Sequence, residues 1–370
     1  MKGRAASWAE LLRVSALFTV PGDALAGAAA TGLRPNRSTL LAIGSSLCLY
    51  EAGMALNDWA DRAEDAVDRP HRPIPSGRIT PRAALTASVA LTAAGLGLAA
   101  RAGRPALTVA TALATTVWAY DLHLKHTPAG PAAMAGARAL DLLLGAVATS
   151  ATSASPPGTR SRAAGRTGAP NGVTAPTDQP TPAARLTASP RRRMPTTALR
   201  SAALLGAHIY AVTAVSRHET QGGSTRTPLL ALATTLAVAA AAADAPADST
   251  PDHPVGSTTG SSPRRAGART LAAPDSRPRP AEARTLTATA GPLVTAVLAA
   301  AYARTPATPL LHAALNPSPP LTQRSVGAGI RAVIPLQATL AARAGAPGTA
   351  LAVLCLAPLA RALARKVSPT

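Results

Sequence analysis

The chain has 370 residues, of which 47% are hydrophobic and only 15% are charged. A soluble domain usually carries about 25% charged residues, so the composition disfavours a soluble protein and points to a membrane protein. The net charge of +20 does not indicate nucleic-acid binding, because much of the arginine lies in two segments rich in Pro, Ser and Thr, without a basic helix, RNA-binding signature or zinc spacing.

Ten apolar runs follow one another along the chain. The clearest, 83–100, holds no charged residue and has the roughly 18 residues that a membrane-spanning helix requires. We predict an all-α integral membrane protein, a bundle of about nine transmembrane helices, or ten if both of the short last runs span. The runs cover residues 8–32, 38–60, 83–100, 105–121, 131–151, 197–216, 228–243, 285–303, 326–342 and 348–364.

Two segments interrupt the apolar pattern. Residues 154–195 and 244–284 are dense in Pro, Ser, Thr, Gly and Arg and contain few large apolar side chains. Such segments bury too little apolar surface to offset the entropy lost on ordering. We therefore predict two disordered loop insertions within a single transmembrane domain, 1–370. Asp244 and Asp248, four residues apart, fall in the second segment, and we interpret them as loop residues.

Counting the predicted helices places two polar loops on one side of the membrane. The segment 58–80 follows two helices and 217–227 follows six, so both loops lie on the side of the N-terminus and can form one site. Basic residues near the N-terminus and in the first loop favour the cytoplasm for that side, whereas the Arg-rich insertions fall on the other side by the same count. We predict a multi-pass protein of the cell membrane with these loops on the cytoplasmic side.

The first polar loop holds an unusual concentration of acid. Five of the 17 acidic residues fall within eleven positions: Asp58, Asp61, Glu64, Asp65 and Asp68. The aspartates are three or four residues apart, which places them on one face of a helix, where like charges repel. A divalent cation would neutralise them. Mg²⁺ takes one or two carboxylates and completes its shell with water and phosphate oxygens, so a diphosphate is a natural bridging ligand.

A basic, proline-rich block follows the acidic residues at once. Its sequence is Arg69-Pro70-His71-Arg72-Pro73-Ile74-Pro75-Ser76-Gly77-Arg78. The prolines end the helix and stiffen a turn. The guanidinium groups can reach phosphate oxygens by charge-assisted hydrogen bonds.

This composite pattern resembles that of the UbiA superfamily of intramembrane prenyltransferases. The first motif of that family, Asn-Asp-x-x-Asp-x-x-x-Asp, is matched by Asn57, Asp58, Asp61 and Asp65, and residues 72–77 match its Arg-Pro-[Leu/Ile]-x-x-Gly turn. The resemblance covers the helical layout but neither insertion. It implies a nine-helix bundle, a lateral opening for an isoprenoid tail, and a polar cap that holds Mg²⁺-diphosphate on the cytoplasmic side.

The place of the second family motif departs from the pattern. Relatives usually carry two or three Asp residues spaced four apart after the sixth helix, whereas this chain reads Ser216-Arg217-His218-Glu219-Thr220-Gln221-Gly222-Gly223. Three alternatives stay open. Glu219 ligates one metal ion, Arg217 binds diphosphate directly in place of a cation, or catalysis has been weakened or lost.

Ionisable groups in or beside apolar runs are costly and often functional. The stretch 120–125, Tyr-Asp-Leu-His-Leu-Lys, resembles the family element Tyr-x-x-x-Leu-Lys, which makes Lys125 a candidate for diphosphate binding. Arg138 and Asp141 lie three residues apart in the fifth predicted helix, where they either pair with each other or bind substrate. Asp23 lies where relatives often carry Asn and is a further candidate for substrate binding.

These residues together predict Mg²⁺-dependent transfer of a prenyl group from a prenyl diphosphate to an acceptor within the membrane. Asp58, Asp61 and Asp65 are the expected catalytic metal ligands, and Asn57 orients or ligates. Arg72 and Lys125 are expected to hold the diphosphate. An apolar interior would keep water from the carbocation-like allylic carbon.

Two other functions are compatible with parts of the sequence. The altered second motif favours a non-catalytic membrane protein that binds or moves an isoprenoid or its conjugate. An ion-coupled transporter is disfavoured, because the acidic cluster lies at a helix end rather than near the bilayer midplane. Quinone precursors, a tetrapyrrole, a glycerophosphate lipid and a sugar phosphate all stay open as acceptors, and so does the length of the prenyl chain.

Overall fold

The computed structural model describes residues 2–152, 194–219, 223–244 and 280–358, and every element in these ranges is helical. The all-α fold predicted from the sequence is therefore confirmed for the described residues. The elements are α1 (Lys2–Leu11), the 3₁₀ helix η1 (Val14–Thr19), α2 (Val20–Ala30), α3 (Arg37–Ala60), α4 (Arg62–Asp68), α5 (Pro81–Ala102), α6 (Arg104–Ala119), the π-helical turn η2 (Tyr120–Leu124), α7 (Gly130–Thr152), α8 (Thr196–Ser216), α9 (Arg226–Ala243), α10 (Pro280–Leu315), α11 (Pro319–Arg343) and α12 (Pro347–Leu354).

Six helices in the described part of the chain are long and apolar enough to cross a membrane, by length and composition: α3, α5, α7, α8, α9 and α11. The protein is thus a multi-pass integral membrane protein. The remaining predicted spans correspond to α2, α6, α10 and α12, which fall outside that criterion. Length explains part of this result, because α6 has only 16 residues and α12 only eight.

The first apolar run is not the single helix expected over 8–32. It divides into α1, η1 and α2, with a break at Arg13, whose backbone is left-handed (φ 49°, ψ 47°). Among the described residues Arg13 is the one non-glycine with a positive φ, a conformation that disfavours helix continuation. The break turns the Arg13 side chain toward the end of α3, where it pairs with Asp58.

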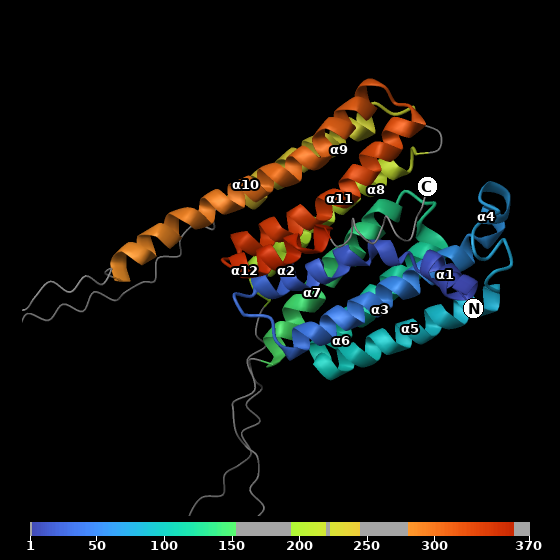
Figure 1. Cartoon of the computed structure of the whole chain (residues 1–370), viewed down its shortest axis with the longest axis horizontal. Coiled ribbons are helices and arrows are strands. Elements are labelled where there is room, and N and C mark those ends of the chain that lie inside the picture. Colours follow the sequence, from blue (N-terminus) through green and yellow to red (C-terminus); the bar gives the residue numbers. More distant parts are fainter. Residues whose placement is uncertain (1, 153–193, 220–222, 245–279, 359–370) are drawn as a thin grey trace, which may run out of the picture.

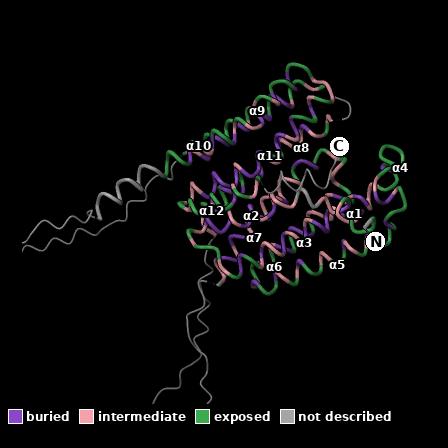
Figure 2. The backbone as a smooth tube through the Cα atoms, viewed as in Figure 1, coloured by how far each residue is buried: buried purple, intermediate pink, exposed green. Residues whose placement is uncertain are grey.

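The helices form two groups that lie side by side in Figure 1. In the first group α3 packs against both α5 and α7, and in the second α10 packs against α9 and α11. The groups meet where α7 packs on α8, and α2 lies between them in contact with α3, α7 and α11. Buried residues follow the inner faces, and exposed residues follow the outer sides of α5, α9 and α10 (Figure 2).

Glycines allow α2 and α7 to approach backbone to backbone. A Cβ atom at Gly27 of α2 would overlap the carbonyl oxygen of Leu142, and one at Gly145 of α7 would overlap the backbone of Ala24. Small residues are the usual means of close helix packing in membranes, where the hydrophobic effect does not drive association. This contact fixes the height of α2 against α7 and therefore of the polar residues that both helices carry.

Most of the two predicted loop insertions lies outside the described residues, at 153–193 and 245–279, so their disorder stays a prediction. The helix α10 begins at Pro280, which is inside the predicted segment 244–284. Asp248 also lies outside the described residues, as do residues 220–222 of the second motif region.

Candidate active site

The acidic stretch lies where α3 ends and α4 begins. The expected continuous helix breaks at Asp61 (φ −83°, ψ 2°), which follows α3 and precedes α4. The break does not disperse the carboxylates, because the amide of Asp65 still donates a hydrogen bond to the carbonyl oxygen of Asp61 at 2.8 Å. Asp58 and Asp65 are 4% and 1% exposed, so both carboxylates are withdrawn from water and need charged partners.

Arginines supply those partners. Arg72 Nη1 lies 3.3 Å from Asp58 Oδ1 and 2.8 Å from Asp65 Oδ2, so the two aspartates, which belong to separate helices, meet at one guanidinium. Arg13 Nη2 lies 3.2 Å from Asp58 Oδ1, and Arg69 Nε lies 3.5 Å from Asp65 Oδ1. This last contact is not a hydrogen bond, and Asp65 Oδ1 is a buried oxygen without one.

The proline-rich turn holds Arg72 in place. Gly77 has φ 74°, a value that suits glycine, and its amide bonds to the carbonyl of Ile74 at 3.0 Å. The Ile79 amide closes the turn on the carbonyl of Pro73, also at 3.0 Å. Ile74 and Ile79 are buried in an apolar cluster with Leu11 and neighbouring residues of α3 and α5, which anchors the turn against the bundle.

A third segment, after α6, reaches the same place. Lys125 Nζ forms an ion pair with Asp61 Oδ1, and Asn57 Nδ2 donates to Asp121 Oδ1 at 3.3 Å. The π-helical turn η2 spaces Asp121 and Lys125 so that one contacts Asn57 and the other contacts Asp61. The acidic motif and the Tyr-x-x-x-Leu-Lys element therefore meet at the end of α3.

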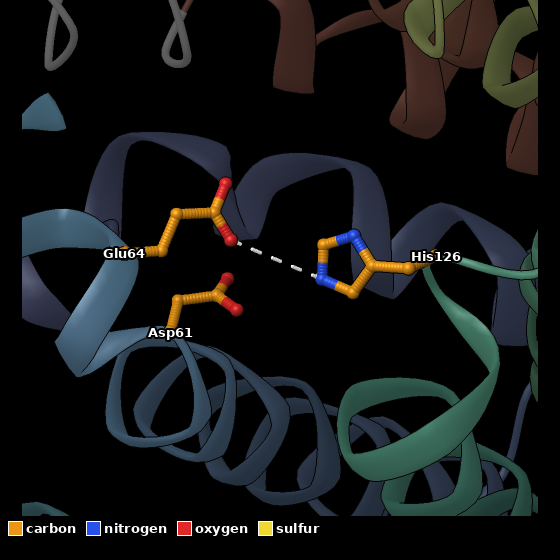
Figure 3. A group of neighbouring side chains, drawn as sticks. All are labelled: Asp61, Glu64 and His126. Atoms are coloured by element: carbon orange, nitrogen blue, oxygen red, sulfur yellow. Dashed lines mark ion pairs between the residues drawn. The ribbon is translucent and has the colours of Figure 1, made fainter.

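One group of side chains in the described residues could hold a cation. Oxygens of Asp61 and Glu64 and a ring nitrogen of His126 all lie within 4.8 Å of one another (Figure 3). Glu64 Oε2 and His126 Nε2 are 4.0 Å apart. Asp58 and Asp65 stand outside this group, held by arginines, and Glu219 stands outside it as well.

The donor set fits Mg²⁺ in part. Two carboxylates at a site open to water match the needs of an ion that keeps several waters. The buried Asp65 Oδ1, without a hydrogen bond, leaves an acceptor that a cation can use after Arg69 or Arg72 moves. The imidazole of His126 is 70% exposed, and its nitrogen is a ligand that Mg²⁺ does not require.

The loop after α8 closes this polar cap. A cavity of about 380 Å³ is lined by residues of all three segments: Asn57, Asp61, Glu64, Arg69, Tyr120, Lys125, His126, Pro131, Thr213, Ser216 and Arg217. Arg217 Nη1 also donates to the carbonyl oxygen of Thr127. The prediction that the two polar loops lie together is therefore confirmed. Glu219 is half-buried, which raises the pKa of its carboxyl, and nearby Arg69 opposes that shift.

A second cavity, of about 300 Å³, runs inward from the cap between α3, α6 and α7. Its outer end is polar, with Arg13, Asn57 and Asp121, and its walls carry apolar side chains such as Leu49 and Val117. Ser46, Arg138 and Asp141 also line it. The cap thus continues into an apolar space with a polar inner wall.

Two predicted substrate-binding residues lie in the interior, away from the cap residues. Asp23 is fully buried on α2, and its Oδ2 lies 2.9 Å from Arg138 Nη2 on α7. The expected alternative, a pair between Arg138 and Asp141, is not among the ion pairs of the described residues. Asp141 instead accepts a hydrogen bond from Ser46 on α3.

The sequence reasoning missed Arg13, Asp121 and His126. Arg13 interrupts an apolar run, and an ionisable residue in such a run is itself an indication of a functional site. His126 directly follows Lys125, but nothing in its spacing connects it with Glu64, which lies 62 positions earlier. Its contact with Glu64 depends on the π-helical turn, which periodicity does not reveal.

Comparison with known proteins finds relatives for part of the chain. Residues 15–163 match the family model described as the UbiA prenyltransferase family. A digeranylgeranylglyceryl phosphate synthase of Methanothrix thermoacetophila is 36% identical over 147 residues, which cover 39% of this chain and 55% of that protein. A chloroplastic chlorophyll synthase of Oryza sativa subsp. japonica is 45% identical over 64 residues, 17% of each chain.

A solved structure described as giving insights into digeranylgeranylglyceryl phosphate synthase in membranes superposes with a TM-score of 0.53, at 14% identity, over 94% of this chain and 100% of that one. At that identity the match supports the fold alone. The chain spans about half the length of the Methanothrix relative. The matched region, which is less than half of the chain, contains the acidic motif, the proline-rich turn and Lys125, and over residues 15–163 the chain is similar to the UbiA prenyltransferase family.

Proposed function

We propose that the protein transfers a prenyl group from a prenyl diphosphate to an acceptor within the membrane and releases diphosphate. One observation carries the proposal. Asp61, at the α3–α4 break, and Glu64, in α4, share a cavity with Lys125 and Arg217 from two other loops. Carboxylates that can bind a metal cation and basic side chains that can bind an anion therefore line the same cavity. A metal-diphosphate requires this arrangement.

Mg²⁺ is the metal that we propose for this site. Asp61 and Glu64 would hold it, with Asp58 and Asp65 as further ligands after their arginines move. The bound ion would supply Lewis-acid stabilisation of the charge that develops on the leaving diphosphate. Glu219, whose carboxyl is close enough to Arg69 to feel its charge, is the candidate ligand from the second motif region.

The basic residues of the cap would bind phosphate oxygens. Arg72 and Lys125 pair with carboxylates here, and both can exchange those partners for a diphosphate once a metal takes the carboxylates. Arg217 lines the same cavity from the opposite loop. Their fixed positive charges would favour departure of the diphosphate, because stabilisation that grows as charge develops lowers the barrier.

The inner cavity supports the second half of the reaction. Its apolar walls, which include Leu49, Leu113 and Val117, would exclude water from an allylic carbon that becomes carbocation-like as diphosphate leaves. Asn57 lies at the border of the two cavities and is oriented by its bond to Asp121. It is therefore placed to hold the reacting end of the donor.

We propose the cytoplasm for the side of the cap, since basic residues gather near the N-terminus and in the first polar loop. The donor is a prenyl diphosphate. The acceptor stays open among quinone precursors, a tetrapyrrole, a glycerophosphate lipid and a sugar phosphate. The relatives named for digeranylgeranylglyceryl phosphate and for chlorophyll are consistent with that range.

A direct assay tests the proposal. Purified protein in detergent is incubated with Mg²⁺, C10 to C20 prenyl diphosphates and a cell lipid extract, and diphosphate release and prenylated products are measured by mass spectrometry. We expect product only when Mg²⁺ is present. A parallel reaction with EDTA is the control.

The altered second motif supports one other function, a membrane protein that binds or moves an isoprenoid conjugate without chemistry. The described part of the loop after α8 holds one acidic residue, Glu219. This residue is not part of the group of Asp61, Glu64 and His126 that could hold a cation. Mg²⁺-dependent binding of a non-hydrolysable prenyl diphosphate analogue, without diphosphate release for any acceptor tried, would favour this second function over transfer.

A further inference from the structure

A mixed group of two carboxylates and one imidazole lies in the cap. Oxygens of Asp61 and Glu64 and a ring nitrogen of His126 are all within 4.8 Å of one another, and the three residues line the 380 Å³ cavity (Figure 3). Asp61 and Glu64 come from the α3–α4 break and from α4, whereas His126 comes from the segment after η2. The imidazole thus reaches the carboxylates from a part of the chain that the acidic motif does not include.

The backbone holds His126 in this position. The amide of Lys125 donates to the carbonyl oxygen of Tyr120 at 3.0 Å, which is the bond of the π-helical turn. The amide of Thr127 donates to the carbonyl oxygen of Leu124 at 2.9 Å. The residues on both sides of His126 are therefore fixed, while its side chain, which is 70% exposed, can turn toward a ligand.

The approach of His126 to Glu64 is not a hydrogen bond. The atoms Nε2 and Oε2 are 4.0 Å apart, which is beyond hydrogen-bond range. As an ion pair between side chains that are 70% and 51% exposed, the contact would add little to stability. Ligands on opposite sides of an octahedral ion bound at about 2.1 Å lie about 4 Å apart. The spacing therefore fits a metal ion between the two groups better than it fits a direct contact.

The donor atoms decide which ion this group prefers. Carboxylate oxygens and water suit both Mg²⁺ and Mn²⁺, whereas an imidazole nitrogen is a good ligand for transition ions and adds little for Mg²⁺. Zinc sites in proteins carry mostly nitrogen and sulfur ligands, and this group offers one nitrogen and two carboxylates. Because Glu64 and His126 are both more than half exposed, water can complete an octahedral shell. Mn²⁺ is the ion that combines these preferences.

One cationic side chain competes with a metal for this group. Lys125 Nζ forms an ion pair with Asp61 Oδ1. Lys125 carries a single charge, whereas a divalent ion would gain three protein ligands at once. Exchange of the ammonium for the ion would also leave Lys125 in the same cavity, where the diphosphate is proposed to bind. The ion pair is therefore compatible with metal binding.

We infer that His126 is a protein ligand of this cation site and that its nitrogen makes the site bind Mn²⁺ in preference to Mg²⁺. The inference rests on the metal site of the proposed function, but not on prenyl transfer. His126 lies outside both the acidic motif and the Tyr-x-x-x-Leu-Lys element, so neither motif assigns it this role.

Bound Mn²⁺ reports its ligands directly. Tag-free protein in detergent is titrated with Mn²⁺, with and without inorganic diphosphate, and free Mn²⁺ is followed by electron paramagnetic resonance. Electron spin-echo envelope modulation then measures coupling of the bound ion to an imidazole nitrogen. We expect this coupling in the wild type. Competition with Mg²⁺ should show that Mn²⁺ binds at least about tenfold more tightly, since even outer-sphere partners of a metal contribute about 10–100-fold to its affinity.

His126→Ala should remove the nitrogen coupling and lower the affinity for Mn²⁺ by at least about tenfold, while the affinity for Mg²⁺ stays nearly unchanged. The exposed side chain makes a folding defect unexpected. His126→Asp should also remove the coupling and bring the two affinities together. The matched control is His123→Ala, the same change at an exposed histidine that lines a different cavity, and it should alter neither the coupling nor the affinities.

Asp61→Asn separates ion selection from ion binding. It removes a carboxylate that both ions would use, so it should weaken Mg²⁺ and Mn²⁺ alike, unlike His126→Ala. Its control is Asp244→Asn, the same change at a carboxylate whose side chain is 74% exposed at the end of α9.

Prenyl transfer, measured separately with each ion, distinguishes failure of this inference from failure of the proposed function. Nitrogen coupling that is lost in His126→Ala, together with a preference for Mn²⁺ but no transfer with either ion, would support the inference and count against transfer. Transfer with Mg²⁺, but no nitrogen coupling or equal affinities in the wild type, would overturn the inference and leave transfer intact. Coupling that persists in His126→Ala would also overturn it. Failure of the wild type to bind either ion would overturn both.

Discussion

Every aspartate of the acidic motif has a cationic partner in this structure. Asp58 pairs with Arg13 and Arg72, Asp61 with Lys125, and Asp65 with Arg72. Binding of a metal-diphosphate would then exchange partners: carboxylates would pass from side-chain cations to the metal, and the cations would pass to phosphate. Such an exchange keeps the number of charge pairs nearly constant, so the partly buried site is never left with an unpaired carboxylate.

Asp61 is the motif aspartate that lies with Glu64 and His126 in the group that could hold a cation. Its replacement should affect chemistry more than folding. Asp61→Asn should lower the rate of prenyl transfer by at least about 100-fold, since even outer-sphere partners of a metal contribute about 10–100-fold. Its side chain is 18% exposed at a helix break, so we expect normal membrane insertion. Diphosphate release measures the rate, with Asp244→Asn as control. Wild-type activity in Asp61→Asn would exclude this metal site.

Arg217 and Glu219 decide what the altered second motif does. Arg217→Ala should weaken binding of a non-hydrolysable prenyl diphosphate analogue by about 1.5–3 kcal/mol if the guanidinium contacts phosphate, with the lower value expected for an exposed side chain. Glu219→Gln should weaken binding only when Mg²⁺ is present. Each effect should couple to Asp61→Asn in a double-mutant cycle, because the loops share one cavity. Independent, additive effects would show that they do not form one site.

At the scale of the helices, the contact between α2 and α7 sets the position of Asp23 on α2 relative to Arg138 on α7. Gly145→Leu should lower the melting temperature of the detergent-solubilised protein, because its side chain would overlap the backbone at Ala24. Overpacking of this kind costs at least about 1–3 kcal/mol. Gly97→Leu on the exposed side of α5, where a Cβ atom meets nothing within 4 Å, is the matched control and should not destabilise the protein. Equal melting temperatures for the two variants would contradict this packing.

Periodicity and helix counting predicted the elements better than their interruptions. The run 38–60 became α3 and the run 131–151 became α7 within one residue at either end. Capping explains the first of these, since Asn36 accepts hydrogen bonds from the Ser38 and Thr39 amides. The break at Arg13 and the π-helical turn η2 could not be predicted, because both depend on side-chain contacts with α3 that are remote in sequence.

The candidate site was predictable only where a linear motif carried it. Asn57, Asp61 and Lys125 lie in such motifs and do meet at the cap. The place of Asp23 in an apolar run makes it a candidate, yet its partners Arg138 and Gln337 come from helices more than 100 residues away in sequence. No spacing rule connects residues that become neighbours only because α2 packs against both α7 and α11.

The molecule as a whole joins two groups of helices through α2 and the α7–α8 contact, with the cap built from loops of both groups. The acidic stretch at the α3–α4 break and the turn η2 belong to the first group of helices, and Arg217 follows α8 of the second group. A change in how the groups sit would therefore open or close the cap. The chain between α7 and α8 links them in sequence, but the packing of those two helices links them independently.

Replacement of residues 154–195 by a short Gly/Ser linker tests that independence. The segment has the composition of a chain that forms no core, and α7 and α8 pack directly against each other on either side of it. Shortening such a loop changes its closure entropy only slowly with length, so stability should change by about 1 kcal/mol or less. Membrane insertion and prenyl transfer should stay near wild-type levels, measured by fractionation and by product yield. A scrambled version of 154–195, with the same length and composition, is the control. Loss of transfer in the linker variant but not in the scrambled one would mean that the length of the loop contributes to function, and loss in both would mean that its sequence does.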